Sequence, residues 1–121
     1  MRFAVAALLF AALPLAACVS AAPPIVEAAR LSDTADTVGP YVVAARVTSA
    51  RPLDKVELVW RLSGAPAFSR EAMTAADSGW TAAIPGVASG GQVLYRVEAT
   101  TVDGDVGADP APPATASFKV D

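Results

Sequence analysis

Apolar and polar residues alternate with a period of two along most of the chain after Pro40. In the segment KVELVWRL, every second residue is apolar and most of the residues between them are charged. This alternation is typical of antiparallel strands that pack one face on a core and expose the other to water. It predicts strands over Tyr41–Thr48, Lys55–Leu62 and Gln92–Thr101, with shorter candidates at Trp80–Ile84 and Ala116–Val120.

The same alternation predicts which side chains face the core. The inward sets are Tyr41, Val43, Ala45 and Val47; Val56, Leu58, Trp60 and Leu62; and Val93, Tyr95, Val97 and Ala99. Turn-forming residues rich in Gly, Pro, Asp and Ser separate these segments, and short strands at this spacing favour a single antiparallel β-sandwich of about seven strands. Two segments, Ile25–Leu31 and Ser69–Ala76, fit either a strand or a brief helical turn.

Aromatic residues support the same interpretation. After residue 17 the chain has six of them, and all except Phe68 fall on predicted inward positions. A small sandwich needs its large side chains inside, so we interpret these residues as core. The alternative is an exposed platform for a sugar, formed by Trp60 and Trp80.

The first seventeen residues have a different character. Met1-Arg2 supplies a positive charge, an uncharged apolar run follows from Phe3 to Leu13, and Pro14 ends that run. This order, closed by the small residues Ala16 and Ala17, is typical of a secretory signal peptide, and the run is too short to span a bilayer as a stable helix.

The tetrapeptide Leu15-Ala16-Ala17-Cys18 follows this run and resembles the lipobox of bacterial lipoproteins. The resemblance implies that the thiol of Cys18 receives a diacylglyceryl group, that the chain is cut before Cys18, and that the new amine is acylated. Val19 stands where an Asp would signal retention in the inner membrane of a Gram-negative cell, which implies the outer membrane, facing the periplasm. The alternative is an ordinary signal cleavage that leaves a soluble exported protein.

A second resemblance covers most of the remaining chain. It is carried by Asp36–Tyr41, Trp60, Met73, Gly79–Gly86, Gly91–Ala99 and Asp103-Gly104, which together are similar to the Ig-like or fibronectin type III-like modules of bacterial exported proteins. Tyr95 resembles the tyrosine of the tyrosine corner, whose hydroxyl caps a loop backbone. We therefore expect a signal peptide over residues 1–17, a lipidated N-terminus and tether over 18–32, and a sandwich over 33–121.

The residue inventory excludes several kinds of chemistry. The 121 residues include one Cys and no His, which rules out His-based triads, His-ligated zinc and an intrachain disulfide. The formal net charge of -3, with no run of Lys or Arg, argues against nucleic acid as a partner. The sequence also has no GxSxG, P-loop or dinucleotide-binding motif. We therefore expect neither an enzyme nor a bound cofactor.

One acidic cluster, Asp103, Asp105 and Asp109, has a spacing that allows two interpretations. Aspartates that alternate on a loop supply oxygen ligands of the kind that calcium prefers. The spacing lacks the remaining ligands of an EF-hand loop, and Asp-Gly between strands is ordinary turn chemistry. The turn is the favoured interpretation, and no metal site is predicted.

A candidate protein-docking face follows from the pairing of two predicted strands. If Lys55–Leu62 pairs with Gln92–Thr101, their outward side chains share one sheet surface. The surface then carries two apolar positions among charges, which is typical of protein interfaces, and its candidate residues are Val59, Arg61, Leu94 and Arg96. The alternative is a solvated face stabilised by cross-strand charge pairs.

These features together predict a non-enzymatic envelope lipoprotein, held on a membrane by acyl chains on Cys18. Its Ig-like module would act through protein contacts or as a spacer. The alternative function is that of a carbohydrate- or ligand-binding module of the bacterial envelope.

Overall fold

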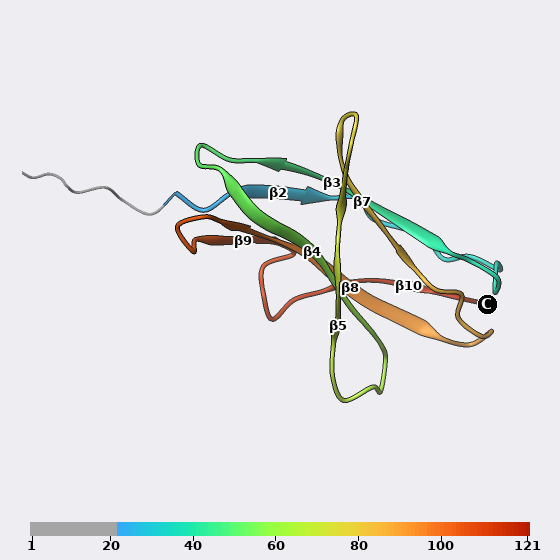
Figure 1. Ribbon diagram of the computed structural model, residues 1–121. Coiled ribbons are helices and arrows are strands. Elements are labelled where there is room, and N and C mark those ends of the chain that lie inside the picture. Colours follow the sequence, from blue (N-terminus) through green and yellow to red (C-terminus); the bar gives the residue numbers. More distant parts are fainter. Residues whose placement is uncertain (1–21) are drawn as a thin grey trace, which may run out of the picture.

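The alternating segments form β-strands in the computed structural model, which describes residues 22–121 (Figure 1). No helix occurs within this range. The strands are β2 (Ile25–Ala28), β3 (Tyr41–Thr48), β4 (Leu53–Leu62), β5 (Ser69–Ala72), β6 (Thr74–Ala76), β7 (Gly79–Ile84), β8 (Gln92–Thr101), β9 (Val106–Asp109) and β10 (Ala116–Lys119). The predictions for β3 and β8 are confirmed to the residue, whereas the total is nine strands instead of about seven.

The strands make two antiparallel sheets packed face to face. One has the order β2-β3-β7-β6, and the other has the order β10-β8-β4-β5 with β9 also paired to β8. Across the first sheet, β2, β3, β7 and β6 correspond to strands A, B, E and D of an immunoglobulin constant domain. In the second sheet, β4 and β8 take the places of strands C and F. The described residues therefore form a small all-β sandwich that is consistent with an Ig-like fold, as predicted.

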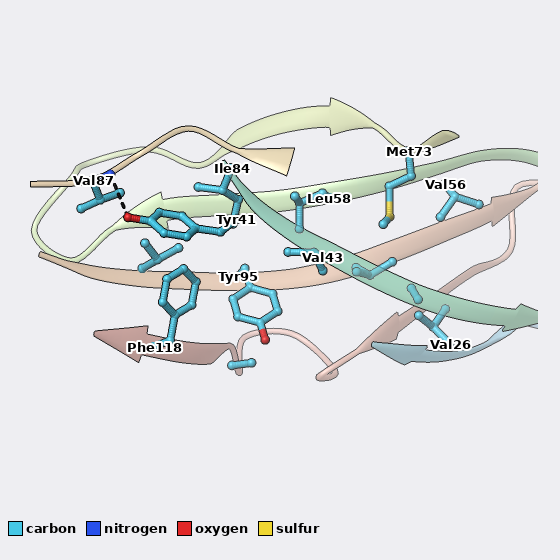
Figure 2. Close-up of a cluster of buried hydrophobic side chains, with 14 of the residues drawn as sticks. Val26, Tyr41, Val43, Val56, Leu58, Met73, Ile84, Val87, Tyr95 and Phe118 are labelled. Atoms are coloured by element: carbon cyan, nitrogen blue, oxygen red, sulfur yellow. Dashed lines mark hydrogen bonds between the residues drawn. The ribbon is translucent and has the colours of Figure 1, made fainter. Parts of the chain in front are cut away.

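Side chains from both sheets meet between them and form one core (Figure 2). Along β8 the burial alternates without a break, so that Val93, Tyr95, Val97 and Ala99 are all fully buried. The ring of Phe118 contacts the rings of Tyr41 and Tyr95 edge-on, with centroids 5.2 Å and 6.1 Å apart. Most of the predicted inward positions are thus confirmed, but Val47 and Trp60 are only partly buried against the core, and Leu62 at the end of β4 is exposed.

The segment Ser69–Ala76 connects the two sheets. It consists of two strands, with β5 paired to β4 in one sheet and β6 paired to β7 in the other. Met73 lies between the two strands, where its backbone N–H donates to the carbonyl of Val56 at 2.8 Å. Its side chain points into the core (Figure 2) and is buried. Both strands are exposed edges, which explains why this segment has no clear alternation.

A second crossing occurs after β2. The chain leaves β3 and runs beside β10, where Thr34 forms a parallel bridge with Val120. The hydroxyl of Tyr95 fixes this crossing, since it donates to the carbonyl of Ala29 and accepts from the N–H of Leu31, both at 2.9 Å. The expected capping of a loop backbone by Tyr95 is therefore confirmed, and the capped loop is the one after β2.

The folded body begins earlier than the sequence suggested. β2 pairs in register with β3, from Ile25 opposite Thr48 to Ala28 opposite Ala45. Residues 25–32, expected to belong to the tether, are therefore part of the sandwich. Of the two conformations considered for Ile25–Leu31, the strand is confirmed for its first half.

Candidate functional site

The candidate docking residues lie side by side, as the predicted pairing of β4 with β8 required. Val59 is directly opposite Arg96, and Arg61 is directly opposite Leu94. β5 continues the same surface, because Arg70 lies opposite Val59 on the other side of β4. Side chains at directly opposed positions of antiparallel strands share a face, so these residues line the outer face of the second sheet.

Val59 corrects the expectation of an exposed apolar centre, because its side chain is 0% exposed. The register places it between two arginines, Arg70 and Arg96. Arginine side chains bury their aliphatic stems along apolar surface while the charged groups reach water. Val59 is therefore the floor of this surface, and a partner cannot reach it. Leu94 is half-buried.

An ion-pair network covers this floor. Arg70 bridges two strands, with its Nη1 atom 3.1 Å from Oε1 of Glu57 on β4 and 2.9 Å from Oε1 of Glu98 on β8. Nε of Arg96 donates to the other oxygen of Glu98 at 2.7 Å. Glu57 and Glu98 are directly opposite each other, where two carboxylates alone would repel. Arg70 removes this repulsion by binding both.

Glu98 is the centre of the network electrostatically. Burial acts to raise the pKa of its carboxyl, but the hydrogen bonds from Arg96 and Arg70 outweigh burial and hold the pKa below its ordinary range. The pKa of Arg70 is raised in turn, mainly by its hydrogen bond to Glu98. Glu98 is thus a fixed anion at neutral pH, which suits a structural charge and not a group that donates protons.

Phe68 completes the surface from the turn that precedes β5. The guanidinium carbons of Arg61 and Arg96 lie 5.1 Å and 4.8 Å from the centre of its ring. Both distances are within the range of a cation–π contact. The exposed side chains of this candidate surface are therefore Phe68 and the half-exposed Arg70, rather than Val59 and Leu94.

Sequence reasoning missed Phe68 and Arg70. The sequence pattern places Phe68 in a connection, and it fits the segment that holds Arg70 to either a strand or a brief helical turn. The signal available was the alternation of Phe68, Arg70 and Ala72, which face the same side once Ser69–Ala72 is a strand. With only four residues in the strand, this signal is too short to be distinctive.

The acidic cluster is divided among three separate contacts. Asp103 forms a 2.6 Å ion pair with Arg51, and Asp105 accepts from the backbone N–H of Ala22 at 3.3 Å. Asp109 binds Arg30 at 3.0 Å and the N–H of Ala28 at 2.8 Å, and the hydrogen bond from Arg30 is the main cause of its lowered pKa. Within residues 22–121 no group of three or more acidic, His or Cys side chains gathers that could hold a metal ion.

A shallow groove lies on the other sheet. It has a volume of about 360 Å³, and β2, β3 and the β6–β7 hairpin line it. Its residues are mostly small, with Glu27, Arg46 and Trp80 as the large ones. Trp80 and Trp60 are only partly buried, and both pack against the core, which agrees with the interpretation of the tryptophans as core residues.

The lipobox residues Leu15, Ala16, Ala17 and Cys18 lie outside the described residues. Between residues 22 and 121 there is no helix with the length and apolar character needed to cross a membrane. Comparison with protein-family models and with curated proteins finds no match for this chain. The class that its fold defines is that of small all-β sandwich domains consistent with an Ig-like fold.

Proposed function

We propose that the protein is a non-enzymatic lipoprotein of a bacterial cell envelope, whose Ig-like module acts through protein contacts or as a spacer. The observation that carries this proposal is Leu15-Ala16-Ala17-Cys18, placed directly after an apolar run with a positive start. Cys18 is the only cysteine of the chain, so the motif also accounts for its presence. Val19, in place of an Asp, favours the outer membrane with the module facing the periplasm.

Such a protein works by tethering. Acyl chains contribute about 0.8 kcal/mol per buried CH₂, so two or three chains on Cys18 hold the module firmly where one would hold it marginally. Fixing a binding module at a surface raises its effective concentration for partners at that surface. The ion pairs described above fit this role, because they stabilise a surface instead of activating a reactive group.

The contact surface of the module is the docking face, now defined as Phe68 and Arg70 over the floor formed by Val59. A planar guanidinium and an aromatic ring are both enriched among the residues that dominate binding energy in protein interfaces. Arg70 already binds two carboxylates, and its exposed half is available to an acceptor on a partner. We propose Arg61, Leu94 and Arg96 as the rim of this surface.

Mass spectrometry tests the anchor. The intact protein is purified from membranes of the organism that makes it, and we expect a chain that begins at Cys18 with a diacylglyceryl group and an amide-linked acyl chain. Cys18→Ser removes the acceptor thiol and should remove the acyl mass and reduce membrane fractionation. A wild-type protein with a free thiol and no acyl mass would refute the anchor.

Cross-linking in intact cells tests the docking face. Arg70→Ala and Phe68→Ala should each abolish the cross-linked product of the wild-type module. The matched control is Arg46→Ala, which removes an exposed arginine from β3 on the opposite sheet. Urea unfolding of each variant separates a lost contact from a lost fold. Undiminished cross-linking in folded Arg70→Ala and Phe68→Ala variants would remove this surface from the proposal.

The ligand-binding alternative rests on the groove beside Trp80. Its volume lies near the lower end of the range for small-molecule pockets. A Trp60→Phe variant leaves Trp80 as the only tryptophan, so that a bound sugar should change the fluorescence of a single residue. If soluble oligosaccharides leave this fluorescence unchanged at millimolar concentration, the alternative fails.

A further inference from the structure

The chain is fixed to the sandwich from its first described residue. The N–H of Ala22 donates to Oδ2 of Asp105, and Pro24 is buried against β9. Gly107 on β9 makes this seat possible, since a Cβ atom there would lie only 1.9 Å from the carbonyl oxygen of Pro24. The backbone of Pro24 therefore occupies the space that any side chain at position 107 would take.

Because Ala22 is held on the sandwich, the segment that joins it to Cys18 is very short. Cys18 and Ala22 are separated by Val19–Ala21, so four residue steps join the cysteine to the seated chain. A fully extended chain spans at most about 3.6 Å per residue, which limits the reach to about 14 Å. An acyl group on Cys18 therefore holds the end of the sandwich that carries Ala22 within that distance of the bilayer.

The same end carries exposed aliphatic side chains. Ile25 is 64% exposed, Val102 is 57% exposed and Val106 is 53% exposed. Ile25 lies opposite the last residue of β3, Val102 lies in the β8–β9 turn, and Val106 begins β9. Figure 1 shows the start of β2, the β3–β4 turn and the β8–β9 turn together at the left end of the molecule, opposite the C-terminus.

Local contacts hold these turns together. The N–H of Val102 donates to the carbonyl of Pro52 at 3.0 Å, which joins the β8–β9 turn to the β3–β4 turn. Arg51 and Asp103 form an ion pair across the same two turns, so their charges offset each other. The Asp105 carboxylate is turned toward the N–H of Ala22. The aliphatic side chains thus project from turns that a backbone hydrogen bond and an ion pair hold together.

We propose that this end of the sandwich is a membrane-contact surface, in which Ile25, Val102 and Val106 meet the lipid interface. The proposal rests on the proposed acylation of Cys18, and it adds an orientation. Apolar side chains held at an interface by a separate anchor bury their surface there without needing enough affinity to bind alone. The strands then point away from the membrane, with the C-terminus farthest from it.

Cysteine accessibility tests the orientation. Val102→Cys and Val106→Cys each introduce the only free thiol of an acylated chain, because the natural Cys18 is blocked. The matched control is Val38→Cys, an 82% exposed position at the opposite end. In opened membranes, a membrane-impermeant maleimide should label the Val102 and Val106 variants at least about fivefold more slowly than the Val38 variant. All three should react equally after dissolution in urea and detergent.

The outcomes separate the inference from the proposed function. Equal labelling of the three variants, on protein that fractionates with membranes and carries acyl mass, would overturn the orientation and leave the anchor standing. Absence of wild-type protein from the membranes would overturn the anchor, and the orientation with it.

A variant with a longer spacer shows whether lipid or another protein covers this end of the sandwich. Inserting about twelve Gly and Ser residues between Ala21 and Ala22 lengthens the segment between Cys18 and the sandwich by a flexible coil. Labelling of the Val102→Cys thiol should then rise to the rate of the Val38→Cys control. Slow labelling that persists with the spacer would show that a protein covers this end, which would overturn the assignment to lipid.

Discussion

The hydroxyl of Tyr95 joins two parts of the chain that are more than sixty residues apart. It donates one hydrogen bond and accepts another where the chain leaves β2. Burial raises the pKa of this hydroxyl, so it keeps the proton that it donates. Because the buried hydroxyl both donates to and accepts from the backbone, it favours a single conformation of the segment that follows β2.

Tyr95→Phe tests this role. Removing the hydroxyl leaves the carbonyl of Ala29 and the N–H of Leu31 without this partner, which should lower the free energy of unfolding by about 1–3 kcal/mol. Urea unfolding measures the change, with Ser117→Ala as a control at an exposed position of β10. A Tyr95→Phe variant as stable as the wild type would contradict the role.

Val59→Asp tests the burial of the docking floor. A carboxylate at this position would be taken out of water beneath Arg70 and Arg96, and we expect a loss of about 3 kcal/mol or more in the free energy of unfolding. Val42→Asp is the matched control, since Val42 is a valine of β3 that is exposed on the other sheet. Chemical denaturation of both variants provides the measurement, and equal stability of the two would refute the burial of Val59.

At the scale of elements, Glu98 links β8 to β5 through Arg70. Its pKa is lowered in the folded protein, so the unfolded chain binds a proton more readily in acid. Stability from this group is therefore fully present above the ordinary glutamate pKa of about 4.3, and it is lost as the pH falls through the folded value.

The effect of Glu98→Gln on the free energy of unfolding should accordingly depend on pH. We expect it to lower the free energy of unfolding by about 1–2 kcal/mol at neutral pH, and by less at a pH acid enough to protonate the wild-type carboxylate in the folded protein. Urea unfolding at both pH values measures the difference, with Glu71→Gln on the exposed face of β5 as control. A penalty that stays constant with pH would show that Glu98 acts through packing and not through charge.

The elements that the sequence predicted best are those buried on one face along their whole length. β3 and β8 alternate over eight and ten residues, and their bounds are as predicted. β9 has only four residues, one of them Gly107, and it lies between turn-forming residues, so it produced no periodic signal. β5 and β6 are exposed edges that change sheets at Met73, and a pattern of burial cannot reveal them.

The candidate site was predicted in part for a related reason. Pairing of β4 with β8 brought Val59, Arg61, Leu94 and Arg96 together, because hydrophobic alternation fixes the register of such strands. The burial of Val59 was not predictable, since it depends on Arg70 from a strand whose existence was open. Long arginine side chains can bury an outward residue, and a pattern of alternation has no means of showing this.

At the scale of the whole molecule, the N-terminal seat determines how the sandwich is joined to whatever precedes it. Gly107→Val should displace Pro24 because the added side chain would meet its backbone. We expect faster hydrogen exchange at Ala22 and at Ala28, whose N–H groups bind Asp105 and Asp109, while the amides of β8 keep their protection. Unchanged exchange at Ala22 and Ala28 would show that the seat does not depend on Gly107.

The opposed ends of the sandwich also decide how it responds to force. A pull between a fixed N-terminus and a weight at the far end acts along β2, whose hydrogen bonds to β3 run across the strand. Such a pull strains these bonds together in shear and does not open them one at a time. The contacts of Asp109 with Ala28 and Arg30 hold β2 to β9 as well, so the module should resist stretching along the direction of β2.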